Sequence, residues 1–224
     1  MVRWGMVIDL KRCIGCHSCT IACKAEHHTP PGVFWAKVVR IESGKYPTVI
    51  RQALPLLCMN CKEPECEKVC PTGATKRRPD GIVTVDSKQC VGCRYCAVAC
   101  PYGARYFAKV WRDYFTGDKE PSSAFAEHSR KKWLEESDKG VVSKCNFCVD
   151  RVEKGRKPAC VDACPCEART FGDLDTPNPR SHSSSRRGEE CSCIRSMALM
   201  QACITCPRGD LEMSLLSILN RGGE

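Results

Sequence analysis

The chain has 224 residues, 21 of them cysteines, and is long enough for one large or two small domains. Cysteines at this density belong either to a disulfide scaffold or to a protein with several metal centres, and their recurrence in C-x2-C arrays favours metal. The formal net charge is +9, but no basic stripe with interleaved aromatics is present, so we expect an acidic partner protein or anionic clusters, and no nucleic acid.

The first nine residues predict a strand over 1–9, which leads directly into cysteine ligands. We recognise no cleavable signal and no leading twin-arginine in them. No stretch of the sequence approaches the roughly 18 apolar residues of a membrane span, so we expect no direct membrane span.

The first ligand group has the spacing C-x2-C-x2-C-x3-C and is followed by Lys24 where related runs carry proline. It consists of Cys13, Cys16, Cys19 and Cys23. Its opening C-I-G-C-H also matches the attachment signature of c-type haem, but the two later cysteines continue the ferredoxin spacing. The group therefore favours an iron–sulfur cluster, with His17 near it and Gly15 leaving room for backbone amides to approach cluster sulfur.

A polar link at 27–32 precedes an alternating stretch that predicts a strand over 34–41, and a second apolar stretch at 48–57 leads to the next ligand group. The second ligand group follows with the spacing C-x2-C-x4-C-x3-C-P, and its longer middle gap only widens a loop. It consists of Cys58, Cys61, Cys66 and Cys70. Residues 74–86 then predict a hairpin turned at Pro79-Asp80-Gly81.

The third ligand group is C-x2-C-x2-C-x3-C-P, the run that ligates iron–sulfur clusters in bacterial ferredoxins. It consists of Cys90, Cys93, Cys96 and Cys100. Three of its thiolates can hold one cubane while the fourth serves a neighbouring cluster. A zinc ribbon uses two separated C-x2-C pairs, so structural zinc explains this array poorly. With a closing strand at 104–110, residues 58–110 predict a two-cluster ferredoxin.

Residues 111–140 form a charged insert that we interpret as a surface connection, with a partner-binding arm as the alternative. A helix is predicted over 129–137, with Trp133 and Leu134 on its packed side. The fourth ligand group follows with the spacing C-x2-C-x11-C-x3-C-P and a helix-like loop at 149–157. It consists of Cys145, Cys148, Cys160 and Cys164.

Four ligand groups in this order resemble the iron–sulfur subunits of the dimethyl sulfoxide reductase, polysulfide reductase and formate dehydrogenase families. The motifs W-G-M-V-I-D at 4–9, C-N-F-C at 145–148 and F-G-D-L at 171–174 belong to the same resemblance. It implies an α+β fold of two ferredoxin-like two-cluster modules, with small antiparallel sheets and short helices. The module at 58–110 is inserted in the module formed by 1–57 and 141–178, with 111–140 as the connecting insert.

The resemblance also implies that each fourth cysteine ligates the other cluster of its pair, giving four 4Fe–4S clusters. The implied ligand sets are Cys13, Cys16, Cys19 and Cys164; Cys145, Cys148, Cys160 and Cys23; Cys58, Cys61, Cys66 and Cys100; and Cys90, Cys93, Cys96 and Cys70. Binding and folding then share one free energy, so we expect the metal-free chain to be largely unfolded.

The implied function is electron transfer between a molybdopterin catalytic subunit and a quinone-linked integral membrane anchor, by a non-catalytic subunit held at the membrane through these partners. A subunit of a hydrogenase or another dehydrogenase is the alternative, and a zinc-binding structural or nucleic-acid-binding protein is the alternative of another class. Lys24, Arg94 and Arg105 are sited to raise cluster potentials, or else are solvated surface charges.

Five cysteines lie outside the four groups. Cys166 reads as a buried free thiol, with a spare ligand as the alternative. The likeness stops after Asn178, and residues 179–224 form an atypical tail that we expect to be disordered or out of frame. Codons can be chosen for 195–207 that, read two bases later, encode E-Y-G-T-N-A-S-V-Y-Y-L-P, which resembles the closing segment of the family. The remaining tail cysteines, for which a zinc site is the alternative, are Cys191, Cys193, Cys203 and Cys206.

Overall fold

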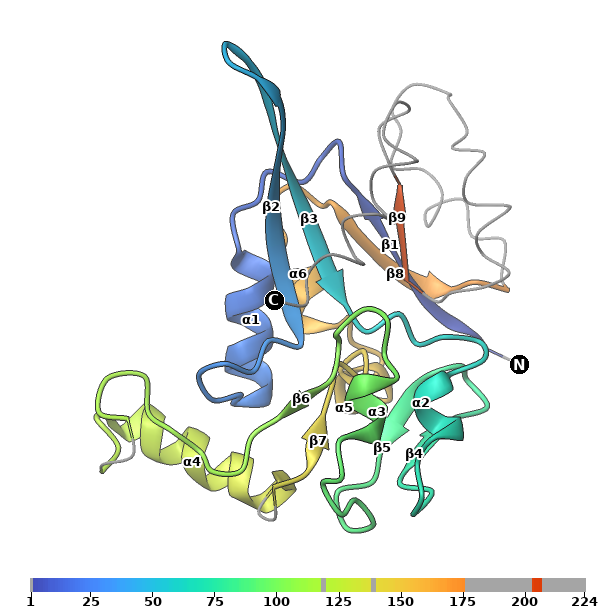
Figure 1. The fold of residues 1–224 in the computed structure, drawn as a ribbon, viewed down its shortest axis with the longest axis vertical. Coiled ribbons are helices and arrows are strands. Elements are labelled where there is room, and N and C mark those ends of the chain that lie inside the picture. The colour runs from blue at the N-terminus through green and yellow to red at the C-terminus, as the bar shows by residue number, and fades with distance from the viewer. Residues whose placement is uncertain (1, 118–119, 138–139, 176–202, 207–224) are drawn as a thin grey trace.

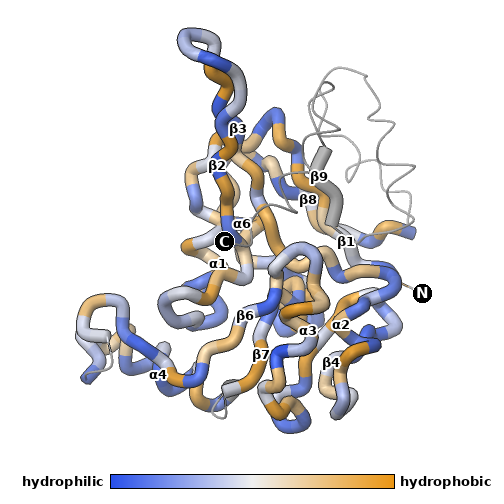
Figure 2. Tube along the Cα trace, viewed as in Figure 1, coloured by the Kyte–Doolittle hydropathy of each residue, from blue (hydrophilic) through white to orange (hydrophobic). Residues whose placement is uncertain are grey.

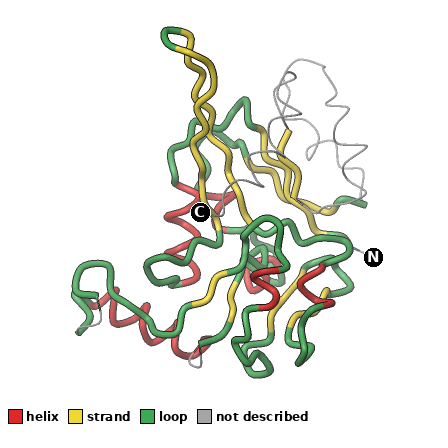
Figure 3. Tube along the Cα trace, in the orientation of Figure 1, coloured by secondary structure: helices red, strands yellow, loops and turns green. Residues whose placement is uncertain are grey.

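The computed structural model describes residues 2–117, 120–137, 140–175 and 203–206, and it shows an α+β fold of small sheets and mostly short helices (Figures 1 and 3). The helices are α1 (Ser18–His27), α2 (Glu65–Lys68), α3 (Tyr95–Val98), α4 (Ala124–Ser137), α5 (Val149–Val152) and α6 (Ala159–Asp162). The strands are β1 (Trp4–Asp9), β2 (Ala36–Lys45), β3 (Thr48–Leu57), β4 (Thr75–Arg77), β5 (Val83–Val85), β6 (Tyr106–Phe107), β7 (Val142–Ser143), β8 (Arg169–Asp173) and β9 (Cys203–Cys206).

Strand β1 lies within the strand predicted over 1–9 and pairs antiparallel with β8, so residues more than 160 positions apart lie side by side. The register runs from Trp4 opposite Asp173 to Ile8 opposite Arg169. Met6 and Ile8 point into the core, as the period of two in a strand requires. This pairing brings the loop after β1, with the first ligand group, next to the end of the fourth.

Strands β2 and β3 form a long antiparallel hairpin that projects from the rest of the molecule (Figure 1). The strand predicted over 34–41 continues to Lys45, because β3 pairs with it along its whole length. Hydrophilic and hydrophobic stretches alternate along the hairpin (Figure 2). Its base is apolar, and Leu54, Leu56 and Leu57 are buried there against the core.

The predicted hairpin at 74–86 is confirmed by β4 and β5, which pair antiparallel around Gly81. Gly81 has φ +86°, a left-handed conformation that a residue without Cβ adopts at little cost. The closing strand predicted over 104–110 is much shorter, because β6 has only β7 to pair with and β7 is two residues long.

Helix α4 begins five residues earlier than predicted, because Ser123 caps it. The Ser123 hydroxyl accepts a hydrogen bond from the Ala126 amide at 3.2 Å. Trp133 is buried at 2% exposure as predicted, whereas Leu134 is 41% exposed, so its predicted burial was wrong. Neighbouring residues of a helix point about 100° apart, so the two side chains do not share a face. The helix-like loop predicted at 149–157 contains one helical turn, α5.

Strand β9 is the described part of the tail, and it lies parallel to β1, with Met6 opposite Cys203 and Asp9 opposite Cys206. The three-stranded sheet, in the order β8-β1-β9, is therefore mixed, whereas small antiparallel sheets were expected. The expectations for the rest of 179–224, including Cys191 and Cys193, lie outside the described residues. In the described ranges, no helix combines the length and the apolar character that crossing a bilayer requires.

Candidate metal centres

The C-x2-C loops of all four ligand groups turn in the same way. The residue before the second cysteine has a left-handed backbone in each group: Gly15 (φ +69°), Asn60 (φ +44°), Gly92 (φ +68°) and Phe147 (φ +56°). Such a turn points successive backbone amides to one side, where they can face an anion. Gly92 is required for space as well, because a Cβ there would overlap the carbonyl oxygen of Gly140.

Set A consists of Cys13, Cys16, Cys19 and Cys164, which line one pocket at the end of β1. Burial raises the pKa of Cys13, and the neighbouring thiols of Cys19 and Cys164 raise it further. The Ala168 amide donates a hydrogen bond to the Cys164 sulfur at 3.3 Å. Cys16 is the exposed member of the set.

Set B consists of Cys23, Cys145, Cys148 and Cys160, all of them buried. Burial raises the pKa of Cys23, as do the thiols of Cys160 and Cys148. Burial likewise raises the pKa of Cys145, and Cys23 and Cys160 add to this. Cys23, which follows the first three cysteines along the chain, therefore lies among the thiols of the fourth group.

Set C consists of Cys58, Cys61, Cys66 and Cys100, each of intermediate exposure. Burial raises the pKa of Cys61 to about 11, with contributions from Cys58, Cys66 and then Cys100. The last cysteine of the third group thus lies with the first three of the second.

Set D consists of Cys70, Cys90, Cys93 and Cys96. Burial raises the pKa of Cys96, and the thiols of Cys90 and Cys70 act on it in the same direction, against Arg105. Burial also opposes ionisation of Cys70, but hydrogen bonds led by the Thr75 amide outweigh it and lower the pKa of Cys70 to about 7. Cys93 belongs to the same loop and is exposed.

The four sets follow one another in the order A, B, C, D. The neighbouring thiol of Cys19 in set A contributes electrostatically to raising the pKa of Cys160 in set B. The thiol of Cys58 in set C likewise contributes to raising the pKa of Cys145 in set B. Sets C and D are joined through Arg105, which interacts with both Cys66 and Cys96. The described thiols therefore form a contiguous series and not four isolated sites.

The donor chemistry of the sets fits iron–sulfur clusters. Each brings together four thiols, and backbone amides of Ala36, Ala159 and Thr75 donate to the sulfurs of Cys23, Cys148 and Cys70. Thiolate ligands with amide hydrogen bonds to sulfur are typical of such clusters. Within the described ranges, no three His, Cys, Asp or Glu side chains lie close enough to share a single metal ion.

Of the three predicted cations, Arg105 is the one that donates a hydrogen bond to a described thiol, whereas Lys24 interacts with Cys23 through its charge alone. Arg105 donates to the Cys66 sulfur at 2.8 Å. The Lys24 ammonium donates to the Val33 carbonyl oxygen at 2.8 Å and lies over the ring of Phe34, and burial lowers its pKa to about 8. Arg94 is exposed and lies over the ring of Phe107.

Sequence reasoning missed three residues that contact the cysteines of the sets, namely His27, Arg169 and Lys144. Nε2 of His27 lies 3.1 Å from the sulfur of Cys148, and burial lowers the pKa of His27 to about 4, so its ring is neutral at pH 7. Arg169 donates to the sulfur of Cys160 at 3.6 Å, and Lys144 donates to the carbonyl oxygen of Cys145 at 2.7 Å. Lys144 directly precedes Cys145 in the sequence, and this position was the available signal for it. No local sequence signal marked His27 or Arg169.

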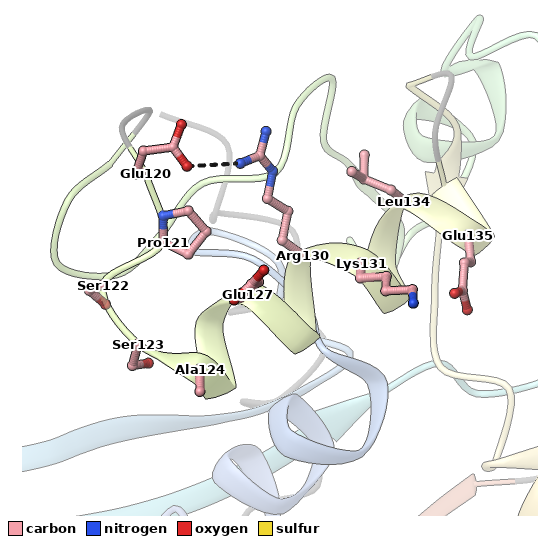
Figure 4. Close-up of a pocket in the computed structure, with 10 residues that line it drawn as sticks. All are labelled: Glu120, Pro121, Ser122, Ser123, Ala124, Glu127, Arg130, Lys131, Leu134 and Glu135. Carbon is pink, nitrogen blue, oxygen red and sulfur yellow. Dashed lines mark ion pairs between the residues drawn. The ribbon is translucent and has the colours of Figure 1, made fainter.

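A separate hollow on the described surface contains no predicted ligand. The hollow along α4 is lined by Glu120, Arg130, Glu135 and their neighbours, and an ion pair of 3.9 Å joins Glu120 to Arg130 (Figure 4). Its open, charged walls offer no thiol and no buried polar group, so the candidate site remains the series of cysteine sets. Cys166 lines the pocket of set A beside Cys164.

Comparison with known proteins supports the same chemistry. Residues 49–114 and 130–174 match the model of a 4Fe-4S dicluster domain, and residues 4–25 match that of a 4Fe-4S binding domain. The cofactors of this chain are therefore 4Fe–4S clusters, and its sixteen cysteines in four groups correspond to four such clusters.

Three relatives cover most of the chain. A selenate reductase subunit of Mesobacillus selenatarsenatis is 44% identical over 79% of this chain and 62% of its own length. A putative iron-sulfur subunit of dimethyl sulfoxide reductase from Halobacterium salinarum is 44% identical over 78% of this chain and 68% of its own length. The iron-sulfur cluster-binding subunit of menaquinone reductase from Nitratidesulfovibrio vulgaris is 36% identical over 81% of this chain and 79% of its own length. The chain belongs to the family of 4Fe–4S iron–sulfur subunits that serve dimethyl sulfoxide reductase and related respiratory reductases.

Proposed function

We propose that the chain is the electron-transfer subunit of an oxidoreductase complex. It relays electrons between a molybdopterin catalytic subunit and a quinone-linked membrane partner through four 4Fe–4S clusters, one held by each of sets A to D. The names of its relatives support both ends of this path, since they include subunits of selenate, dimethyl sulfoxide and menaquinone reductases. The chain itself performs no bond-making reaction.

The contiguous order of the four sets is the observation that carries the proposal. A thiol of set A and a thiol of set C each interact electrostatically with a thiol of set B, and Arg105 interacts with thiols of both set C and set D. A cluster supplies one-electron redox chemistry, and its potential responds to charge, hydrogen bonds and burial. The chain's contribution is to keep the thiols at fixed separations and to surround them with amides and cations.

Exposure at the two ends of the series supports two separate partners. Cys16 in set A and Cys93 in set D are exposed, whereas set B is buried throughout. The residue after the first cysteine is exposed and apolar in both end loops, Ile14 at 69% and Val91 at 68%. Apolar residues around a redox centre suit contact with another subunit and exclude water from the junction.

The same proposal includes the arrangement of the chain in two ferredoxin-like modules and its place at the membrane. Sets A and B combine ligands from the two ends of the described sequence, and sets C and D combine ligands from 58–100, which supports an inserted module. Attachment to the membrane comes through the partner subunits.

Anaerobic purification of the chain with its co-expressed partners tests the proposal. We expect about sixteen irons per chain, four interacting EPR signals on reduction, and co-purification of a large molybdopterin protein. A colourless chain containing zinc in place of iron would refute the proposal. A cluster-loaded chain that co-purifies with a hydrogenase or another dehydrogenase would refute the molybdopterin partner alone.

A further inference from the structure

Three cations are buried in the described chain, and each lies where two of the cysteine sets meet. Arg169 is 5% exposed, Lys144 is 3% exposed and Arg105 is 7% exposed. Lys and Arg are rarely buried to this extent unless a negative charge compensates them. Their positions therefore call for an anion close by.

Arg169, the first residue of β8, lies between sets A and B. Its guanidinium donates to the sulfur of Cys160 in set B at 3.6 Å and to the sulfur of Met6 at the same distance. Arg169 also lines the pocket of set A, where its charge favours the thiolate form of Cys13. One cation thus acts on two sets whose ligands come from opposite ends of the described sequence.

Lys144 lies between sets B and C. Its ammonium donates to the carbonyl oxygen of Cys145 at 2.7 Å and to the side-chain oxygen of Asn60 at 3.4 Å. Asn60 belongs to the loop of set C, where its amide group donates to the carbonyl oxygen of Cys58. The charge of Lys144 favours the thiolates of Cys145 in set B and Cys66 in set C.

Arg105 lies between sets C and D. One guanidinium nitrogen donates to the sulfur of Cys66 at 2.8 Å, and another donates to the Thr75 hydroxyl at 3.1 Å, which orients the group. Its charge favours the thiolates of Cys66 and also of Cys96 in set D. The planar guanidinium presents several donors and can face two sulfurs at once.

These cations contact the candidate cluster ligands directly: Arg169 and Arg105 donate to the sulfurs of Cys160 and Cys66, and Lys144 donates to the carbonyl oxygen of Cys145. A 4Fe–4S cluster with four thiolates carries net negative charge, and that charge grows by one on reduction. A cluster in each set would place this negative charge beside the buried cations, and a reduced cluster would gain more from the pairing than an oxidised one.

We propose that Arg169, Lys144 and Arg105 are shared counter-ions, one at each junction of the series, and that each raises the reduction potentials of the two clusters beside it. This rests on the proposed function, because it assumes one cluster in each set. The three residues position charge and take no part in bond-making.

Redox titration followed by EPR of the anaerobically purified complex tests the proposal. The variants Arg169→Gln, Lys144→Gln and Arg105→Gln remove one charge each. At the wild-type midpoint potential, each should lower the ratio of reduced to oxidised cluster about tenfold, which is 59 mV for a one-electron couple. The shift should affect the two clusters beside the substituted residue and leave the other two unchanged.

Charge-conserving variants separate the charge from the packing of the side chain. Arg105→Lys and Lys144→Arg keep the cation and change its shape, so their potentials should stay close to the wild-type values. The control Arg51→Gln removes an exposed cation that pairs with Glu42 on the β2–β3 hairpin, and all four potentials should be unaffected.

Two results would overturn the proposal. One is unchanged potentials in glutamine variants that retain all their iron, which would leave the proposed electron transfer intact. The other is an equal shift in Arg105→Lys and Arg105→Gln, which would assign the effect to shape. Should one glutamine variant fail to bind iron, the remaining two sites carry the same test, whereas a wild-type chain without clusters refutes the proposed function itself.

Discussion

Trp4 at the start of β1 stacks on Phe171 of β8, with ring centroids 5.2 Å apart and ring planes 14° from parallel. Phe171 in turn meets Phe147 edge-on, at 5.5 Å between centroids. Phe147 directly precedes the ligand Cys148. Three aromatic rings therefore connect the strand that leads into set A with the loop that contributes to set B.

Phe171→Ala should lower the free energy of unfolding by about 3 kcal/mol, because it removes both ring contacts and leaves a cavity. Denaturation of the cluster-loaded protein, followed by cluster absorbance under anaerobic conditions, measures the change. Phe125→Ala is the matched control, since Phe125 is exposed and its loss should change stability by less than about 0.5 kcal/mol. Equal effects of the two substitutions would contradict the stabilising role of the ring contacts.

Serine substitutions at the crossing cysteines test which thiols share a cluster. Cys164→Ser and Cys13→Ser should alter the same EPR signal, because both belong to set A. Cys23→Ser and Cys145→Ser should alter a second signal in common, because both belong to set B. A Cys23→Ser spectrum that matches Cys13→Ser would show that ligands follow chain order instead.

Cys166→Ser is the matched control for these ligand variants. Cys166 lines the pocket of set A beside Cys164, but each of the four sets already contains four thiols without it. Iron content and all four signals should be unchanged. Loss of iron in Cys166→Ser, equal to that in Cys164→Ser, would make Cys166 a ligand.

Removal of iron should unfold the chain. Burial raises the pKa of Cys148 to about 12, and Cys23 and Cys145 are also raised, so without metal these thiols are protonated and no longer bridge the segments that carry them. Cluster absorbance and far-UV circular dichroism should be lost together on treatment with a chelator and an oxidant. Helix and strand signals that persist after complete bleaching would contradict this coupling.

Asp113→Asn should loosen the loop that packs beside α1. The carboxylate accepts hydrogen bonds from the amides of Phe115 at 2.7 Å and Ser122 at 3.1 Å. These bonds, led by that of Phe115, lower the pKa of Asp113 to about 2. The stabilisation is therefore complete above the ordinary pKa near 4 and disappears as the pH falls through about 2.

Limited proteolysis at pH 7 measures the loosening, and cleavage within 113–122 should become faster in Asp113→Asn. Glu120→Gln is the control, because the Glu120 side chain is exposed and pairs only at 3.9 Å with Arg130. Equal cleavage rates in Asp113→Asn and in the wild type would show that the carboxylate does not hold this loop.

Local features of the fold were largely predictable from the sequence. Alternation over 34–41 predicted β2, and Pro79-Asp80-Gly81 predicted the hairpin of β4 and β5, because period and turn chemistry act over a few residues. The start of α4 was missed, although Ser123 precedes it as a cap. The length of β6 was overestimated, because a strand extends only as far as its partner, and β7 lies more than 30 residues further on.

The candidate site divides along the same line. C-x2-C spacing identified the loops, since the covalent chain alone keeps such thiols close together. His27 escaped notice, because Cys148 is 121 residues away and only the packed structure brings the two together. Arg169 is nine positions from Cys160, but no sequence pattern marked it as buried beside that thiol. Arg105 was one of three cations considered, and only its burial beside Cys66 distinguishes it from Lys24 and Arg94.

The sequence by itself determined the chemistry of this protein: cysteines in ferredoxin spacing select iron and sulfur, whatever the rest of the chain does. The tertiary structure alone decided that the thiol of Cys19 lies near that of Cys160, that set C adjoins set B, and that a buried cation stands at each junction. The reason is physical. Ligand spacing is set by a few covalent bonds, whereas the order of the sets and the burial of charge depend on contacts such as β1 with β8, which join residues more than 160 positions apart.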